Sequence, residues 1–204
     1  ELHLSCMSVQ TELPFNQKMK NLKVVSYSSN RSFYFDPILN TLSTVANYSL
    51  KSLKLGEDTF LRNFYKLTNF QNLEQLSFTI KNKIQNFDWI SNMPNLVNID
   101  VSCLGTLNNS LITALAQYKS VNLLELSLQI DNNYPMLDRP ITNQQAELIG
   151  KFINLKTLKI KSDLAEILNK VCFQHFSNLK NLEEIALEYY CSAMFSDGYL
   201  LTII

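Results

Sequence analysis

The stretch Asn154-Leu155-Lys156-Thr157-Leu158-Lys159-Ile160 decides the fold of this chain of 204 residues. It has asparagine and leucine, two variable residues, a second leucine, one variable residue and a final apolar residue. Several other stretches repeat this form closely or loosely, and recurrence of this kind predicts a chain built from repeats. The close copies are Asn72–Phe78, Asn95–Val101, Asn122–Leu128 and Asn181–Leu187, and the looser copies are Asn21–Tyr27 and Ser49–Leu55.

The first leucine of each copy marks the repeat interval, which is shortest on either side of Leu73 and longest from Leu123 to Leu155. The last two apolar residues of a copy, such as Leu158 and Ile160, are two positions apart, so a β-strand places both on one face. Because one repeat cannot bury that face alone, we expect stacked repeats with a parallel sheet. Leu2-His3-Leu4 has the form of one more strand end, giving eight strands. The marker leucines are Leu22, Leu50, Leu73, Leu96, Leu123, Leu155 and Leu182.

Between the predicted strands, apolar residues follow helical spacing. Asp36-Pro37 reads as an N-cap followed by a proline in the first turn. Thr142 with Gln145 reads as a capping box, and so does Asp163 with Glu166. We expect these helices to form the outer layer of the stack. The predicted segments are one after Pro37, Arg62–Asn69, Phe87–Met93, Ser110–Tyr118, and those that begin near Thr142 and Asp163.

The asparagine that opens each copy lies where the chain turns from helix into strand. Asparagine side chains form hydrogen bonds with nearby backbone groups and tolerate left-handed dihedral angles. We therefore expect them to satisfy turn amides that the sheet cannot reach, with Ser49 in the same position in one copy.

These repeats resemble the leucine-rich repeat family, nearest its variable-length, helix-containing class of ribonuclease-inhibitor-like and F-box-associated repeats. The resemblance covers nearly the whole chain. It implies an α/β solenoid of about eight repeats, with a curved parallel sheet on the concave face and helices on the convex face. The asparagine that the family places after the last strand leucine is matched only by Asn30, so regular curvature is not expected. We interpret residues 1–204 as a single domain within a longer solenoid, because both ends lie in apolar repeat sequence.

Composition argues against several function classes. The 18 basic and 18 acidic residues leave no basic excess for a general grip on nucleic acid. The sequence has no apolar stretch of about 18 residues, so no membrane-spanning helix is predicted. The sequence contains no phosphate-binding loop, metal motif or catalytic motif. Its four glycines and two histidines fit none of these, and none of its four cysteines forms a Cys-x-x-Cys pair. We predict no cofactor, no small-molecule substrate and no catalysis, and reduced thiols in an intracellular, cytoplasmic protein.

The variable residues of the strands form the predicted binding surface. They fall into rows that run from each strand to the next across the stack. In the first row Lys51 precedes Glu74, and Lys156 precedes Glu183, so each pair brings opposite charges together on neighbouring strands. Such pairs stabilise a sheet by about 0.2–1 kcal/mol each, which is the simplest interpretation of them.

Val97 and Leu124 lie between those charged pairs in the same row. Adjacent apolar side chains surrounded by charge are typical of the centre of an interface with a polar rim. Incidental exposure of single apolar residues is the alternative. The predicted partner-binding residues on the strand face are Lys51, Glu74, Val97, Leu124, Asp100, Glu125, Lys156 and Lys159.

Residues 129–141 lie in the longest repeat interval, before Leu155, and read as an inserted loop. Tyr134 and Met136 lie in it, close to prolines. Inserted loops on repeats often belong to the binding face, and tyrosine is a favoured interface anchor. Drift in loop length explains the insertion equally well, so these two residues are second-choice candidates.

We expect a non-catalytic module that binds or scaffolds one or more protein partners through its strand face. Two alternatives stay open at this point. The chain could be the substrate-recognition part of a ubiquitin ligase, as the F-box resemblance implies, or the regulatory repeats of an enzyme whose catalytic domain lies outside this chain. Neither alternative is decided by fold class, because one fold supports many functions.

Overall fold

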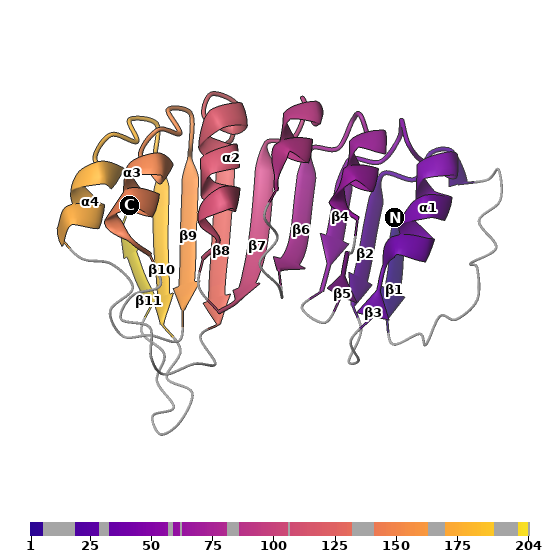
Figure 1. Cartoon of the computed structure of the whole chain (residues 1–204), viewed down its shortest axis with the longest axis horizontal. Coiled ribbons are helices and arrows are strands. Elements are labelled where there is room, and N and C mark those ends of the chain that lie inside the picture. Colours follow the sequence, from indigo (N-terminus) through magenta and orange to yellow (C-terminus); the bar gives the residue numbers. More distant parts are fainter. Residues whose placement is uncertain are drawn as a thin grey trace, which may run out of the picture. The chain divides into compact units, whose positions relative to one another are not determined.

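The computed structural model describes residues 1–5, 19–28, 33–56, 59–61, 63–80, 86–105, 107–131, 141–162, 170–189 and 200–203 (Figure 1). The chain divides into two compact units. The first contains Glu1–Thr79 and Asp88–Leu96, and the second contains Ile80–Phe87 and Val97–Ile204. Tyr134 and Met136, and the predicted helix start at Asp163, lie outside the described residues.

The first unit is built on parallel strands, each supplied by one copy of the repeat. Their order in the sheet follows the sequence, and equivalent apolar residues stay in register, so that Val25 faces Leu53 and Leu53 faces Leu76. These residues are buried, as the repeat pattern predicts. The strands are β1 (Leu2–Ser5), β2 (Val24–Ser28), β4 (Ser52–Leu55) and β6 (Gln75–Ile80), with a separate parallel pair, β3 (Phe33–Tyr34) and β5 (Thr59–Phe60).

The returns between these strands lie on one face of the sheet, but they are not all α-helices (Figure 1). The longer interval, from Leu22 to Leu50, contains helix α1 (Asp36–Val45). In the two shortest intervals, which meet at Leu73, the helical elements among the described residues are the 3₁₀ turns η2 (Phe64–Asn69) and η3 (Asp88–Asn92). A short return thus has room for a single tight turn where a longer one has room for a helix.

Asp36 does not cap α1, contrary to the sequence prediction. Phe35 occupies the N-cap position without a side-chain hydrogen bond, and Asp36 is the first helical residue, with Pro37 beside it in the first turn. The Asp36 carboxylate instead accepts a hydrogen bond of 3.0 Å from the backbone amide of Asn63, in the next return. It therefore joins neighbouring repeats rather than starting its own helix.

Large aromatic side chains fill the core beneath the short returns of the first unit. Phe64 from η2 stacks on Trp89 from η3, with ring centroids 5.5 Å apart. Phe78 from β6 meets both rings, with centroids 5.4 Å from Phe64 and 6.1 Å from Trp89. All three are buried, so aromatic volume compensates for the missing helical turns.

The second unit has longer strands, again parallel and in sequence order. Asp100 faces Ser127 in β8, and Ser127 faces Lys159 in β9, as the predicted rows require. A final strand pairs antiparallel with the last repeat strand, an arrangement that the repeat pattern did not predict. The strands are β7 (Asn98–Leu104), β8 (Glu125–Asp131), β9 (Thr157–Ser162), β10 (Glu184–Tyr189) and the antiparallel β11 (Leu200–Ile203).

The boundaries of β8 correct the predicted loop at residues 129–141. Gln129 and Ile130 belong to the strand and pair with Lys161 and Ser162 of β9. Ile130 is buried, and Ile141, at the other end of the interval, is buried too. Residues 132–140 lie outside the described residues, so the structure neither supports nor opposes Tyr134 and Met136 as binding residues.

Every described return of the second unit is an α-helix: α2 (Asn109–Lys119), α3 (Asn143–Ile149) and α4 (Lys170–Phe176). The capping box of Thr142 and Gln145 is confirmed, since each side chain bonds the backbone amide of the other residue. Gln145 also donates to the carbonyl of Leu107, at 2.9 Å, and so joins α3 to the start of the preceding return.

The repeated asparagines bind the preceding repeat. Asn72 Nδ2 donates to the carbonyl of Tyr48 at 2.7 Å, and Asn154 Nδ2 donates to that of Val121 at 2.7 Å. Asn181 donates to the carbonyl of Ile153 at 2.8 Å. The predicted role in satisfying turn amides is therefore wrong for these residues: they satisfy carbonyls one repeat away. Ser49 also bonds the preceding repeat, but at another position: its hydroxyl donates to the carbonyl of the repeat leucine Leu22 at 2.9 Å.

Candidate partner-binding surface

The first row of strand-face residues is confirmed within each unit by a repeated backbone contact. The amide of each row member donates to the carbonyl of the member in the preceding repeat. In the second unit this chain of 2.8 Å hydrogen bonds runs from Val97 through Leu124 and Lys156 to Glu183. In the first unit Glu74 donates to Lys51 in the same way, also at 2.8 Å.

Both predicted charge pairs are present on this surface. The Lys51 ammonium lies 2.5 Å from the Glu74 carboxylate, and the Lys156 ammonium lies 2.6 Å from that of Glu183. A third pair, Lys159 with Glu184 at 4.0 Å, was not predicted because the partners come from different rows. All these side chains are about half exposed, so each pair is worth about 0–1 kcal/mol.

Val97 and Leu124 are both half-buried, and the Leu124 amide bonds the Val97 carbonyl. Asp100 and Glu125 are exposed on the neighbouring strands β7 and β8. The predicted apolar pair and its acidic neighbours therefore lie on one face of the second unit. Lys51 and Glu74 lie on the strand face of the first unit.

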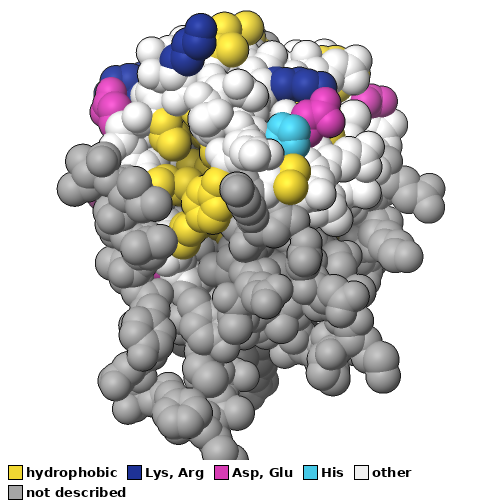
Figure 2. All heavy atoms as spheres, turned by 90° about the vertical axis from the view of Figure 1, so that its left-hand side faces the viewer, with side chains coloured by type: hydrophobic (Ala, Val, Ile, Leu, Met, Phe, Trp, Pro, Cys, Tyr) yellow, Lys and Arg dark blue, Asp and Glu magenta, His cyan; other side chains and the backbone are white. Residues whose placement is uncertain are grey.

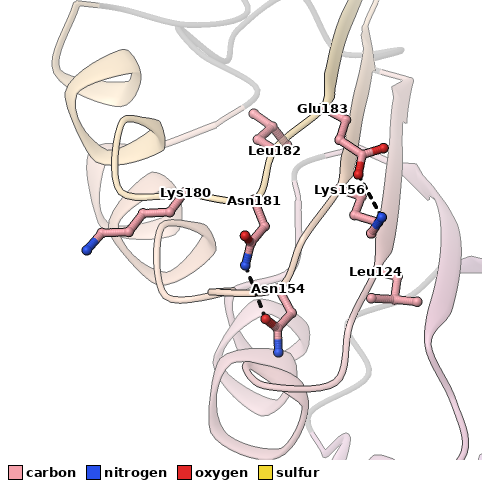
Figure 3. A pocket seen from close by; sticks show the side chains of 7 residues that line it. All are labelled: Leu124, Asn154, Lys156, Lys180, Asn181, Leu182 and Glu183. Atoms are coloured by element: carbon pink, nitrogen blue, oxygen red, sulfur yellow. Dashed lines mark hydrogen bonds and ion pairs between the residues drawn. The ribbon is translucent and has the colours of Figure 1, made fainter.

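A pocket opens where the chain enters β9 and β10 (Figure 3). Its volume is about 410 Å³. Asn154 and Asn181 lie on one side, joined by a hydrogen bond of 3.2 Å, and the Lys156–Glu183 pair lies on the other. Leu124 contributes an apolar wall, whereas the Lys180 side chain extends away from the charged pair. The lining residues are Leu124, Asn154, Lys156, Lys180, Asn181, Leu182 and Glu183.

Leu182 and Lys180 are pocket residues that the sequence did not reveal. The other first leucines of the repeats are buried, but Leu182 is only half-buried, although the pattern gave it the same role. No signal in the sequence distinguishes it. Lys180 precedes the repeat asparagine, and a row drawn through that position would have found it.

The same position before the asparagine carries exposed apolar residues in the second unit. Val121 is 55% exposed and Ile153 is 52% exposed. The turns that carry them are bonded to one another, because Ile153 donates its amide to the carbonyl of Ser120 at 3.1 Å and Asn154 donates to that of Val121. Two apolar side chains therefore continue the surface from the pocket along the turn edge.

Helix α4 presents a separate group of apolar side chains at the end of the second unit that Figure 2 faces. Val171 and Phe173 are each 39% exposed, and Phe173 meets the buried Phe176 edge-on with centroids 6.4 Å apart. His175, between them in sequence, is half-buried.

Lys119, the last residue of α2, is a buried charge in the second unit. Removal from water disfavours the charged ammonium, so burial lowers the pKa of Lys119 below its usual value. Lys119 is far in sequence from every pocket residue except Leu124. We therefore expect its burial to affect stability rather than binding.

The described residues contain no group of three or more histidine, cysteine or acidic side chains placed to hold a metal ion. Cys103 and Cys172 are both buried, and the other two cysteines lie outside the described residues. Among the described helices, none is both long enough and apolar enough to cross a membrane.

Repeated parallel strands, helical returns and asparagine bonds between repeats define a leucine-rich repeat fold of the α/β class. No protein-family model and no curated protein matches the sequence. Among solved structures, the chain is similar to an internalin C2 (inlC2) of Listeria monocytogenes, at 16% identity and a TM-score of 0.41, covering 84% of this chain and 73% of that one. It is also similar to an internalin (inlF) of the same organism, at 14% identity and a TM-score of 0.32, covering 85% of this chain and 64% of that one. Similarities this distant do not bear on what the chain binds.

Proposed function

We propose that this chain is a non-catalytic leucine-rich repeat module that binds a protein partner through its strand face. The observation that carries the proposal is Leu124, a half-buried leucine between the apolar Val97 and the Lys156–Glu183 ion pair, at the wall of a pocket. An apolar centre with a charged rim is the usual anatomy of a protein interface.

The rigidity of the site supports this proposal. The asparagine bonds from Asn154 and Asn181 fix the turns that lead into β9 and β10, and the backbone bonds of Leu124 and Lys156 fix the row beneath the pocket. A surface whose backbone is already ordered loses little conformational entropy when it binds. Asp100, Glu125 and Lys159, exposed on the same face, would supply the polar rim.

The long returns of the second unit favour the helix-containing class that the sequence resembles, and we place those repeats nearest it. The short returns with η2 and η3 depart from that class. No feature of the described residues favours recognition of ubiquitin-ligase substrates or regulation of a catalytic domain over simple partner binding, so neither is proposed.

The substitution Leu124→Glu tests the proposal. It places a carboxylate at the apolar centre, next to Glu125 and the Lys156–Glu183 pair, and we expect it to weaken partner binding by about 2 kcal/mol or more, as for a central interface residue. The measurement is quantitative affinity capture from the source cells with the wild-type chain, followed by affinity determination for each recovered protein.

Tyr65→Glu is the matched control, because Tyr65 is an exposed apolar residue on η2 and receives the same charge. Both variants are first shown to fold by circular dichroism. The proposal predicts that Tyr65→Glu keeps the wild-type partners while Leu124→Glu loses them. Equal retention of every partner by a folded Leu124→Glu variant would contradict it.

A further inference from the structure

The strand face of the first unit carries an excess of positive charge. Lys23, Lys51 and Lys54 are all exposed there, on β4 or immediately before β2 and β4. Among the described residues of β2, β4, β6 and their entry turns, Glu74 is the carboxylate on this face, and Lys51 already pairs with it at 2.5 Å. Beside β1, Glu1 lies 3.4 Å from His3 and so has a basic neighbour of its own.

Lys23 and Lys54 have no ion pair within the described residues. Their strands are adjacent: the carbonyl of Lys23 accepts the amides of Lys51 and Ser52, and Lys54 faces Ser26 in register. The two ammonium groups therefore stand over neighbouring strands. The side chains that flank Lys54 across the strands are short, Ser26 on β2 and Ser77 on β6.

Ser52 adds a polar group without a partner to the same face. By strand alternation it lies on the side of Lys54, opposite the buried Leu53. It is only 5% exposed, and its hydroxyl has no hydrogen-bond partner among the described residues. A buried hydroxyl without a hydrogen bond is unfavourable, because it has lost water and gained nothing in exchange.

The strand face of the second unit differs, because its lysines are matched by carboxylates. The lysines of β9 and of the turn that enters it lie beside the glutamates of β10 and of the turn that enters that strand. Two of these pairs are ion pairs, and in the third Lys161 faces Glu188 in register. The pairs are Lys156 with Glu183 at 2.6 Å, Lys159 with Glu184 at 4.0 Å, and Lys161 opposite Glu188.

From these observations we infer that the strand face of the first unit binds an acidic segment of a partner protein. Carboxylate side chains of that segment would pair with Lys23 and Lys54. This inference rests on the proposed function, that the strand face binds protein, and adds the chemistry of the partner. Complementary charge of this kind selects partners and speeds association.

An acidic protein segment fits this face better than a nucleic acid does. On β2, β4, β6 and their entry turns the outward residues are lysine, serine, valine, glutamine, threonine and glutamate, without an aromatic ring on which bases could stack, and the His3 imidazole on β1 lies beside the Glu1 carboxylate. The chain as a whole has no net charge, which removes the general attraction that a phosphate backbone requires.

The test uses the full chain and a fluorescein-labelled dodecapeptide of alternating glutamate and serine, with fluorescence anisotropy as the readout. We expect binding at low ionic strength that weakens as the Debye length falls from about 30 Å at 0.01 M salt to about 8 Å at 0.15 M. The double variant K23E/K54E should bind the peptide about tenfold more weakly, because two attractions become repulsions. The control K66E/K151E carries the same change in net charge on the helical side and should stay within about twofold of wild type.

Three results would overturn the inference: equal loss of affinity in K23E/K54E and K66E/K151E, no binding of the peptide by the folded wild-type chain, or equal affinity for a dodecamer of deoxythymidine. Sedimentation gives a fourth contradicting result. If the wild-type chain associates with itself and K23E/K54E abolishes that association, the face binds a second copy of this chain rather than an acidic partner. Leu124→Glu should leave peptide binding unchanged, so failure here and failure of the proposed site at Leu124 can be told apart.

Discussion

The two units build the same repeat with returns of different length, and their cores differ accordingly. In the first unit, the most closely spaced repeat leucines, Leu50, Leu73 and Leu96, are joined by the 3₁₀ turns η2 and η3, which pack through Phe64 and Trp89. In the second unit, longer intervals carry α2, α3 and α4. Return length therefore selects the type of outer element, and aromatic side chains fill the space that a short return leaves.

Their strand faces differ as well. The second unit pairs its lysines with glutamates on the next strand, whereas Lys23 and Lys54 of the first unit lack such pairs within the described residues. Both units share the hydrogen bonds from the repeat asparagine, shown by Asn72 in one and by Asn154 in the other. Each unit is thus held by the same kind of hydrogen bond between repeats, while core and surface chemistry differ between the units.

The largest expected effect is the loss of an aromatic side chain in the short-return unit. Trp89→Ala should lower the free energy of unfolding by about 3–5 kcal/mol, because it leaves a cavity against Phe64 and Phe78 that a single 3₁₀ turn cannot fill. Amide hydrogen exchange measured in urea should show protection lost first in β4 and β6, while β8 and β9 keep theirs.

Leu115→Ala in α2 is the comparison, since Leu115 is fully buried in a long return. It should cost less than Trp89→Ala and should reduce protection in the second unit instead. An equal loss of protection across both units with either variant would show that they unfold together, and the contrast between their cores would then have no energetic meaning.

The shared asparagine bonds should matter equally in both units. Asn154→Ala removes the 2.7 Å bond to the Val121 carbonyl and Asn72→Ala removes the equivalent bond to Tyr48, so each should cost about 1 kcal/mol in urea denaturation. Asn154→Ser should recover part of the loss, because the Ser49 hydroxyl also bonds a carbonyl of the preceding repeat, that of Leu22 at 2.9 Å. A negligible cost for both alanine variants would remove the asparagines from the account of stability.

The smallest effect concerns Lys119, a charge buried in the long-return unit. Its folded-state pKa is lowered by burial, so between that value and 10.5 the unfolded chain binds more protons and stability rises with pH. Wild type should therefore gain stability relative to Lys119→Met between pH 7 and about pH 10. Urea denaturation of both proteins at both pH values measures this, and a constant difference between them would contradict it.

Much of the fold was predictable because it rests on local and periodic signals. The repeat leucines, the rows through Lys51, Leu124 and Lys156, and the capping box of Thr142 all follow from spacing along the chain. The lengths of the repeat intervals also predict the type of return, although the helical spacing of the apolar residues suggested a helix in each. The two shortest intervals leave room for η2 or η3 but not for a longer helix.

What the sequence did not reveal depends on contacts between repeats. The acceptors of Asn72 and Asn154 lie one repeat away, and Asp36 bonds the next return instead of capping its own helix. The pocket depends on Leu182 being half-buried, and burial of one leucine among equivalent ones is set by stacking. No single-repeat pattern contains that information.

The central claim, that the strand face at Leu124 meets a protein partner, is tested most directly by site-specific photocrosslinking. Benzoylphenylalanine replaces Leu124 in one chain and Tyr65 in another, and both are irradiated in the source cells. The account predicts a discrete crosslinked protein from position 124 and none from position 65, which lies in a return of the first unit rather than on a strand face. Crosslinks to the same proteins from both positions, or only from position 65, would contradict it.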